Sequence, residues 1–146
     1  MTKLYMAYGS NLNLRQMGFR CPTAKVYGTG QLQGYRLIFN RVATIVPEKN
    51  AMVPVAIWEI DAACEKALDM YEGFPNLYRK EYLKVTVNGK EIEAMVYIMN
   101  TGKPQLPPKS YYETIKEGYH DVGFDTVHLD TAVQKTRERM LEGWAM

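Results

Sequence analysis

Cysteine and histidine are scarce in this chain of 146 residues, with two of each. So few cysteines do not suggest a disulfide scaffold, and they suit a reducing compartment. The histidines, His120 and His128, make no convincing catalytic triad with a serine, and no two ligand-type residues show the spacing of a metal site. We therefore expect neither a metal nor an organic cofactor.

Long apolar runs and a strong charge of one sign are also missing. The segment Met1–Gly9 resembles a strand rather than a signal peptide, and no run approaches the length of a membrane span. A net charge of +2 is too small to indicate the clustered basic face of a nucleic-acid-binding protein. We expect a cytoplasmic protein that binds neither nucleic acid nor membrane, and the sequence leaves the oligomeric state open.

What is present is ordinary globular composition, with 47% hydrophobic and 23% charged residues. The length is that of one domain, so we expect residues 1–146 to form a single domain. A chain of this size buries roughly two thirds of its unfolded surface and needs no cross-link for stability.

The first half of the chain alternates short strand and helix signals. Residues 3–7 predict a strand, followed by a short helix that Ser10 or Asn11 would cap and Gly18 would end. Three short strands are expected at 33–40, 43–46 and 52–60, broken by glycine and proline. Asp61 begins a helix that ends at Gly73, with an apolar stripe at helical spacing that comprises Cys64, Ala67, Leu68 and Tyr71.

The second half begins with the strongest local signal. Asn88-Gly89 between two β-rich runs predicts a type I′ hairpin over residues 82–99. Ser110 fits a capping box that opens another helix. A last helix is expected from 125 or 126 to about 142, with inward positions at Leu129, Val133, Met140 and Leu141. This order is not regular βαβ alternation, so we expect an α+β fold with a small mixed, barrel-like β-sheet flanked by helices.

The turn Tyr8-Gly9-Ser10-Asn11 lies between the first strand and the first helix. Glycine allows a ligand to approach the backbone, and the amides at a helix start are free donors for an anion. The spacing is neither that of a phosphate loop nor that of a dinucleotide fingerprint. An ordinary capped turn accounts for the pattern at least as well when it is taken alone.

Glu72 stands at the end of the helix that Asp61 begins. A carboxylate there faces the negative end of the helix dipole, and its neighbours Tyr71 and Phe74 are aromatic. Burial would raise its pKa toward neutral, as a general acid–base requires. The alternative is an exposed glutamate at a frayed helix end. Cys64 lies on the apolar stripe and is expected to be a core residue rather than a nucleophile.

Three segments together resemble the γ-glutamylcyclotransferase family, also called AIG2-like. They are Leu4–Leu12, Leu68–Arg79 with its Glu-Gly and Tyr-x-Arg, and Pro107–Tyr111 followed by Ile115 and Gly118. The strand 43–47 also matches, and the resemblance spans about residues 4 to 118 in the family's order. A related family with Tyr-Gly-Ser-Leu is a poorer match, because position 11 is Asn.

The resemblance implies a mixed α/β fold and release of 5-oxoproline from a γ-glutamyl amino acid or γ-glutamylamine, without a cofactor. The family's catalytic glutamate corresponds to Glu72. Its substrate-binding residues correspond to Tyr5, Met6, Ala7, Tyr8, Gly9, Ser10, Asn11, Leu12, Tyr78 and Tyr111. The partner expected is a small γ-glutamyl substrate. A non-catalytic module of the same fold that binds a metabolite is the alternative.

Overall fold

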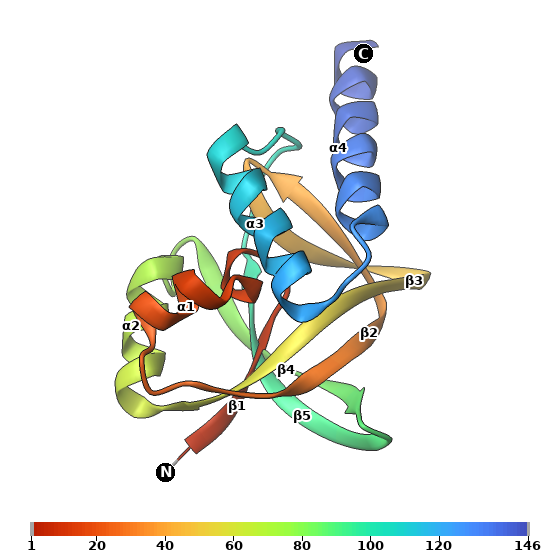
Figure 1. Ribbon diagram of the computed structural model, residues 1–146. Helices are drawn as coiled ribbons and strands as arrows, with labels where there is room; N and C mark the ends of the chain where they lie inside the picture. Colours follow the sequence, from red (N-terminus) through yellow and green to blue (C-terminus); the bar gives the residue numbers. More distant parts are fainter. Residues whose placement is uncertain (1, 146) are drawn as a thin grey trace.

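The computed structural model describes residues 2–145 (Figure 1). The strands are β1 (Thr2–Ala7), β2 (Lys25–Asn40), β3 (Val42–Asp61), β4 (Tyr78–Val87) and β5 (Lys90–Met99). The helices are the 3₁₀ turn η1 (Ser10–Leu12), α1 (Leu14–Arg20), α2 (Ala62–Glu72), α3 (Lys109–Val122) and α4 (Val127–Ala145). No helix within these residues is long and apolar enough to cross a membrane.

The strands close into a barrel in the order β1-β3-β2-β4-β5. All neighbouring pairs are antiparallel except β1 and β5, which run parallel where Tyr5 lies opposite Met95. The sheet is therefore mixed and closed, and the predicted α+β fold with a barrel-like sheet flanked by helices is confirmed.

The three short strands predicted between residues 33 and 60 are wrong, because the chain forms one long hairpin there. β2 and β3 pair along almost their whole length and turn at Arg41, whose φ is 72°. Gly34 lies at a register shift between Gln33 and Tyr35, and Pro47 pairs with Tyr35 inside the ladder. The glycine and the proline thus accompany a bulge in a continuous hairpin and do not interrupt it.

Local signals at α2 and at the β4–β5 hairpin are confirmed. The Asp61 side chain accepts a hydrogen bond from the amide of Cys64 at 2.8 Å, and Gly73 ends α2 in the left-handed region with φ 66°. Asn88 and Gly89 have φ values of 52° and 76°, as a type I′ turn requires.

Three predicted helix details are wrong. Asn13, and neither Ser10 nor Asn11, caps α1, because its side chain accepts from the amide of Gln16 at 3.0 Å. Gly18 lies inside α1, which continues to Arg20. The helix α3 begins after Pro108 without a side-chain cap, so Ser110 forms no capping box.

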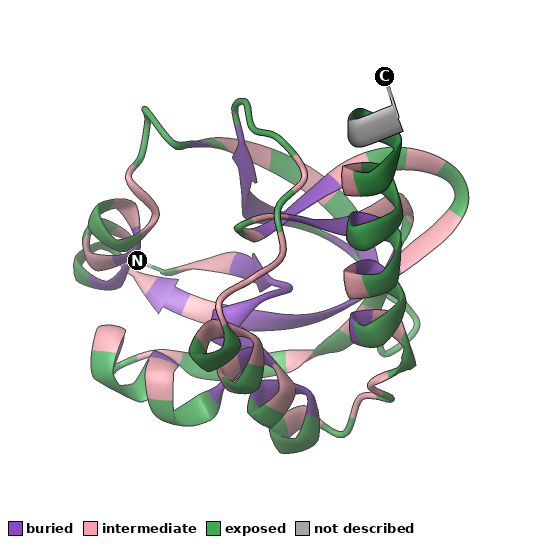
Figure 2. Ribbon diagram, turned by 90° about the horizontal axis from the view of Figure 1, so that it is seen from above, coloured by how far each residue is buried: buried purple, intermediate pink, exposed green. Residues whose placement is uncertain are grey.

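The core fills the barrel and extends under α3 and α4 (Figure 2). Met6, Phe39, Ile57 and Met95 are fully buried among its strands. The helix α4 packs on β2 through its first turns, where Leu129, Ala132 and Thr136 are buried. Leu141, predicted to point inward, is 64% exposed, because the last turns of α4 extend beyond the barrel (Figure 1).

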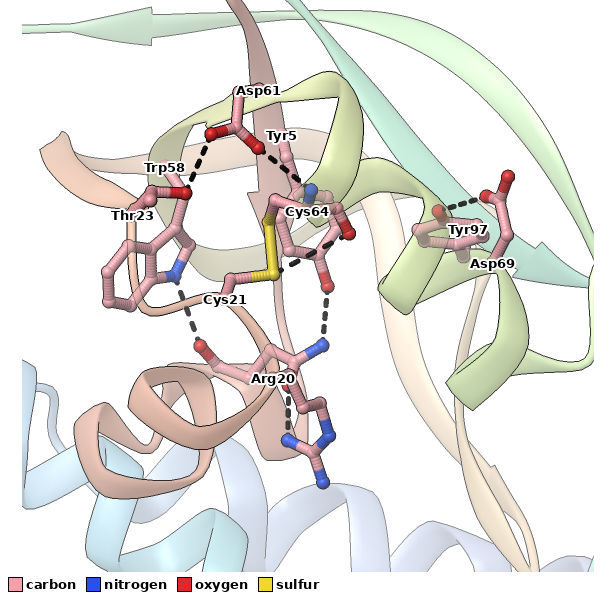
Figure 3. Close-up of a disulfide and its surroundings, with 10 residues drawn as sticks. Tyr5, Arg20, Cys21, Thr23, Trp58, Asp61, Cys64, Asp69 and Tyr97 are labelled. Carbon is pink, nitrogen blue, oxygen red and sulfur yellow. Dashed lines mark hydrogen bonds between the residues drawn. A yellow bond between two sulfur atoms is a disulfide. The ribbon is translucent and has the colours of Figure 1, made fainter.

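The two cysteines form a disulfide, although so few cysteines did not suggest a disulfide scaffold. Cys21 directly follows α1, Cys64 lies in the first turn of α2, and their Cα atoms are 4.9 Å apart (Figure 3). Cys64 is buried, as predicted, but as half of a cross-link. The bond ties α1 to α2 and weighs against a strongly reducing compartment, so the cytoplasmic location remains only a prediction.

Candidate active site

A cavity of about 250 Å³ opens where the end of β1, the end of α2 and the start of β4 meet α3. Most of the predicted site residues line it, namely Tyr5, Met6, Tyr8, Gly9, Ser10, Asn11, Glu72, Tyr78 and Tyr111. Ala7 and Leu12 do not, since both are buried in the core beside it. The structure thus brings three distant sequence segments to one cavity.

The turn from Tyr8 to Leu12 forms one wall. The 3₁₀ bonds run from the Leu12 amide to the Gly9 carbonyl at 3.0 Å and from the Asn13 amide to the Ser10 carbonyl at 3.1 Å. The amides of Gly9, Ser10 and Asn11 donate to no acceptor within residues 2–145. The indole of Trp58 fixes the turn from below by donating to the Asn11 carbonyl at 3.1 Å.

Gly9 fits a narrow place in this wall. A Cβ atom built on it would lie 3.3 Å from Ala43 Cβ and 3.7 Å from the Tyr111 hydroxyl. Because the backbone of Gly9 faces the cavity without a side chain, a ligand can approach its amide closely.

The helix α3 holds the turn in place. A Cβ atom on Gly118 would lie 2.7 Å from the Asn13 nitrogen and 2.8 Å from the Leu12 carbonyl carbon, so only glycine allows this approach. The Asn13 side-chain amide donates to the Thr114 carbonyl at 2.9 Å and to Glu117. The same helix brings Tyr111 to the cavity.

Glu72, the last residue of α2, is the carboxyl group that lines the cavity. Burial raises the pKa of Glu72 from 4.5 to about 7, and the positive charge of Arg20 partly opposes that rise. The carboxyl group has no hydrogen-bond partner in the part of the chain that the structure describes. A carboxyl group with this pKa can take up and give back a proton near neutral pH.

Four tyrosines surround this carboxyl group, of which Tyr5, Tyr8 and Tyr78 are buried and Tyr111 is partly buried. Loss of contact with water raises the pKa of all four above its ordinary value. They are therefore neutral phenols. The Tyr8 hydroxyl donates to the Tyr97 carbonyl at 2.7 Å, and the Tyr78 hydroxyl donates to the Ala43 carbonyl at 2.6 Å.

Tyr5 and Tyr111 differ from these two because their hydroxyls act as acceptors. The Tyr5 hydroxyl accepts from Asn11 Nδ2 at 2.9 Å, and the Tyr111 hydroxyl accepts from the Ala43 amide at 3.1 Å. Their phenolic protons have no acceptor among residues 2–145, so they are available to a ligand in the cavity.

Several lining residues were not predicted from the sequence, namely Val42, Ala43, Tyr71, Leu77 and Tyr97. Tyr71 was assigned to the apolar stripe of α2, yet it is 43% exposed and its hydroxyl is 2.9 Å from Ser10 Oγ. In the sequence, only its position next to Glu72 indicates that Tyr71 lies at the site. Tyr97 donates to Asp69 at 2.6 Å, a contact that no local pattern indicates.

A metal ion would find few ligands in this cavity. Within residues 2–145, no group of three or more His, Cys, Asp or Glu side chains is arranged to hold one. The chemistry available from the cavity residues is proton transfer at Glu72 and hydrogen bonding from amides and phenols.

Comparisons with known proteins identify the family to which most of this chain is similar. Residues 5–120 match the family described as gamma-glutamyl cyclotransferase, AIG2-like. Gamma-glutamylcyclotransferase of Homo sapiens is 31% identical over an alignment of 126 residues that covers 77% of this chain and 66% of the human protein. The protein of the same name from Mus musculus is 30% identical over 128 residues, covering 78% of this chain and 68% of its own length.

A solved structure named gamma-glutamyl cyclotransferase superposes with a TM-score of 0.80 at 26% identity, over 94% of this chain and 87% of that one. The fold and the cavity place the chain among proteins built on this small closed barrel. The chain belongs to the gamma-glutamyl cyclotransferase, AIG2-like family. It spans just under two thirds of the human relative's length.

Proposed function

We propose that this chain cyclises the γ-glutamyl group of a small substrate, releasing 5-oxoproline and a free amine, with Glu72 as the acid–base residue. The observation that carries the proposal is the position of Glu72 in the cavity. Its pKa is about 7, and the same cavity is lined by backbone amides that have no acceptor among residues 2–145. The family membership supports the same reaction.

In this reaction the α-amino nitrogen of the substrate attacks its own γ-carbonyl carbon. A carbon–nitrogen bond forms to close a five-membered ring, and the carbon–nitrogen bond to the leaving amine breaks. The substrate enters with an α-ammonium group, and the released amine leaves as an ammonium ion, so two protons pass between the nitrogens. Glu72 carries each proton in turn, which requires a carboxyl group whose two forms are both populated near pH 7.

The other cavity residues orient the substrate. The free amides of Gly9, Ser10 and Asn11 hold either the substrate's α-carboxylate or the oxyanion that develops on the γ-carbonyl oxygen. The free phenolic protons of Tyr5 and Tyr111 bind further oxygens of the glutamyl group. Folding the substrate back onto itself supplies much of the rate, since well-oriented intramolecular groups reach effective molarities on the order of 10⁵ M or more. The mechanism needs no cofactor.

The leaving amine belongs to an amino acid or to a simple amine. Tyr71 and Leu77 line the cavity and are exposed to solvent, so we propose that the leaving group extends along them. The aromatic ring of Tyr71 and the aliphatic side chain of Leu77 are apolar. We therefore expect them to contact the carbon skeleton of the leaving group.

The test is incubation of the purified chain with a panel of γ-glutamyl amino acids and γ-glutamylamines, with 5-oxoproline measured by mass spectrometry. We expect at least one member to give 5-oxoproline and its free amine in equal amounts. Saturable binding of a panel member without any turnover would instead identify a metabolite-binding module.

A further inference from the structure

Arg20 ends α1 and contacts two cavity residues without lining the cavity itself. Its Nη1 donates to Asn11 Oδ1 at 2.6 Å, and its Nη2 donates to Gln16 Oε1 at 3.0 Å. Its Cζ lies 3.5 Å from the centroid of the Tyr71 ring. The guanidinium plane thus stacks on an aromatic face while its edge forms hydrogen bonds, a geometry that lysine does not reproduce.

The two partners belong to different elements that line the cavity. Asn11 is part of the turn after β1 and is 2% exposed. Tyr71 directly precedes Glu72 on α2, and its hydroxyl is hydrogen-bonded to Ser10 Oγ. Figure 3 shows Arg20 next to Cys21, whose disulfide to Cys64 joins the same two helices. Arg20 therefore fixes the turn relative to the helix that carries Glu72.

The hydrogen bond to Asn11 also determines how Tyr5 is used. A guanidinium group only donates, so Asn11 presents its oxygen to Arg20 and its Nδ2 to Tyr5. The Tyr5 hydroxyl then accepts, and its own proton is left for the cavity. Without Arg20, the Asn11 amide could rotate and take up the Tyr5 proton.

The charge of Arg20 acts on Glu72 as well. The titratable groups that face Glu72 from the surrounding elements are Arg20, Tyr5, Tyr8, Tyr71, Tyr78 and Tyr111. Arg20 is the cation in this set, and its charge lowers the pKa of Glu72 against the larger effect of burial.

We infer that Arg20 is a positioning residue of the active site, which orients Asn11 and Tyr71 and places a positive charge close to the residues that carry the chemistry. The inference rests on the proposed function, since Glu72 and the turn are the groups it serves. Arg20 itself does not touch the substrate.

The test separates the charge of Arg20 from its shape. Arg20→Met removes the charge, and Arg20→Gln removes it while keeping a donor for Asn11, in case the methionine variant does not fold. Arg20→Lys keeps the charge but loses the planar guanidinium group that stacks on Tyr71. Arg15→Met is the matched control, because Arg15 lies on the same helix and its side chain pairs with Glu117 at the surface.

Two readouts are needed, namely kcat and KM for 5-oxoproline release across pH, and the NMR titration of the Glu72 carboxyl carbon. In the neutral variants we expect the pKa of Glu72 and the acid limb of kcat/KM to move to higher pH. In Arg20→Lys we expect both to stay near wild type, while KM rises roughly fivefold because the stack is lost. Arg15→Met should match wild type in both.

An unchanged Glu72 titration in the neutral variants, or a wild-type KM in Arg20→Lys, would overturn the inference. A wild-type protein without turnover would refute the proposed function instead. The NMR titration would still decide whether Arg20 acts on Glu72, so the two failures can be told apart.

Discussion

At the scale of single residues, the burial of Glu72 destabilises the fold at high pH and also makes the carboxyl group suitable for proton transfer. Burial holds its folded-state pKa at about 7, against an ordinary value of 4.5. A charged Glu72 is thus disfavoured in the fold, and that penalty is what keeps both protonation states available near neutral pH.

The first prediction concerns stability. Between pH 4.5 and about 7 the folded chain holds a proton on Glu72 that the unfolded chain has lost, so the free energy of unfolding falls as pH rises through this window. At pH 8 the accumulated loss is roughly 3 kcal/mol, since one pKa unit corresponds to about 1.4 kcal/mol. Glu72→Gln should therefore be more stable than wild type at pH 8 and lose this advantage below pH 4.5, as measured by urea unfolding.

The exposed Glu93 on β5 provides the matched control, because Glu93→Gln changes the same chemical group away from the cavity. Its stability relative to wild type should vary little with pH. A stability difference between Glu72→Gln and wild type that is flat across this pH range would contradict the raised pKa.

A second residue-scale prediction concerns Gly9. Gly9→Val places methyl groups where a Cβ atom already lies 3.3 Å from Ala43 Cβ and close to the Tyr111 hydroxyl. Substrate binding should weaken, with KM rising roughly tenfold or more, which corresponds to about 1.4 kcal/mol. Gly18→Val on α1 is the control, because nothing lies within 4 Å of the added Cβ atom. Equal KM values for the two variants would show that Gly9 does not face the substrate.

At the scale of elements, α3 determines where the turn lies. In an open helical position, alanine in place of glycine stabilises a protein by up to about 1 kcal/mol. Gly118→Ala should have the opposite sign and destabilise by about 1–3 kcal/mol, because its Cβ atom meets the backbone of Leu12 and Asn13 at under 3 Å. Gly18→Ala has open space and should be neutral or stabilising. Thermal unfolding of both variants tests this, and equal signs would contradict the close packing of α3 on η1.

The disulfide is a second link between elements. Cys21 and Cys64 are separated by 43 residues, and closing a loop of this length removes about 4 kcal/mol of chain entropy from the unfolded state in the simplest model. Reduction should therefore lower the urea midpoint of unfolding, with thiol titration to confirm that both cysteines are free. An unchanged midpoint in the reduced protein would mean that the bond does not constrain the unfolded chain.

Local chemistry explains which elements the sequence predicts well. Asp61 caps α2 through its side chain, and Gly73 and the Asn88-Gly89 pair act through their own backbone conformation. The limits of α2 and the β4–β5 turn therefore follow from a few neighbouring residues. Gly34 and Pro47 mislead because a bulge and an opposite strand accommodate them, and the sequence shows neither.

At the scale of the whole molecule, barrel closure assembles the cavity from segments far apart in the chain. The resemblance supplied Glu72, the turn and Tyr111, because these lie in recognisable motifs. Arg20 and Tyr97 lie in no such motif, and their roles depend on which helix or strand packs beside them. The pairing of Cys21 with Cys64 could not be predicted for the same reason, since it depends on α1 ending beside α2.

The central claim is that this barrel uses Glu72 to move protons during cyclisation. Its most direct test is the rate of 5-oxoproline release at pH 7 by wild type and by Glu72→Gln, with Glu93→Gln as control, on the best substrate of the panel. We predict a loss of roughly 10²-fold or more in kcat for Glu72→Gln, the range expected for removal of a general acid–base, and no loss for Glu93→Gln. Release by Glu72→Gln at the wild-type rate would contradict the account.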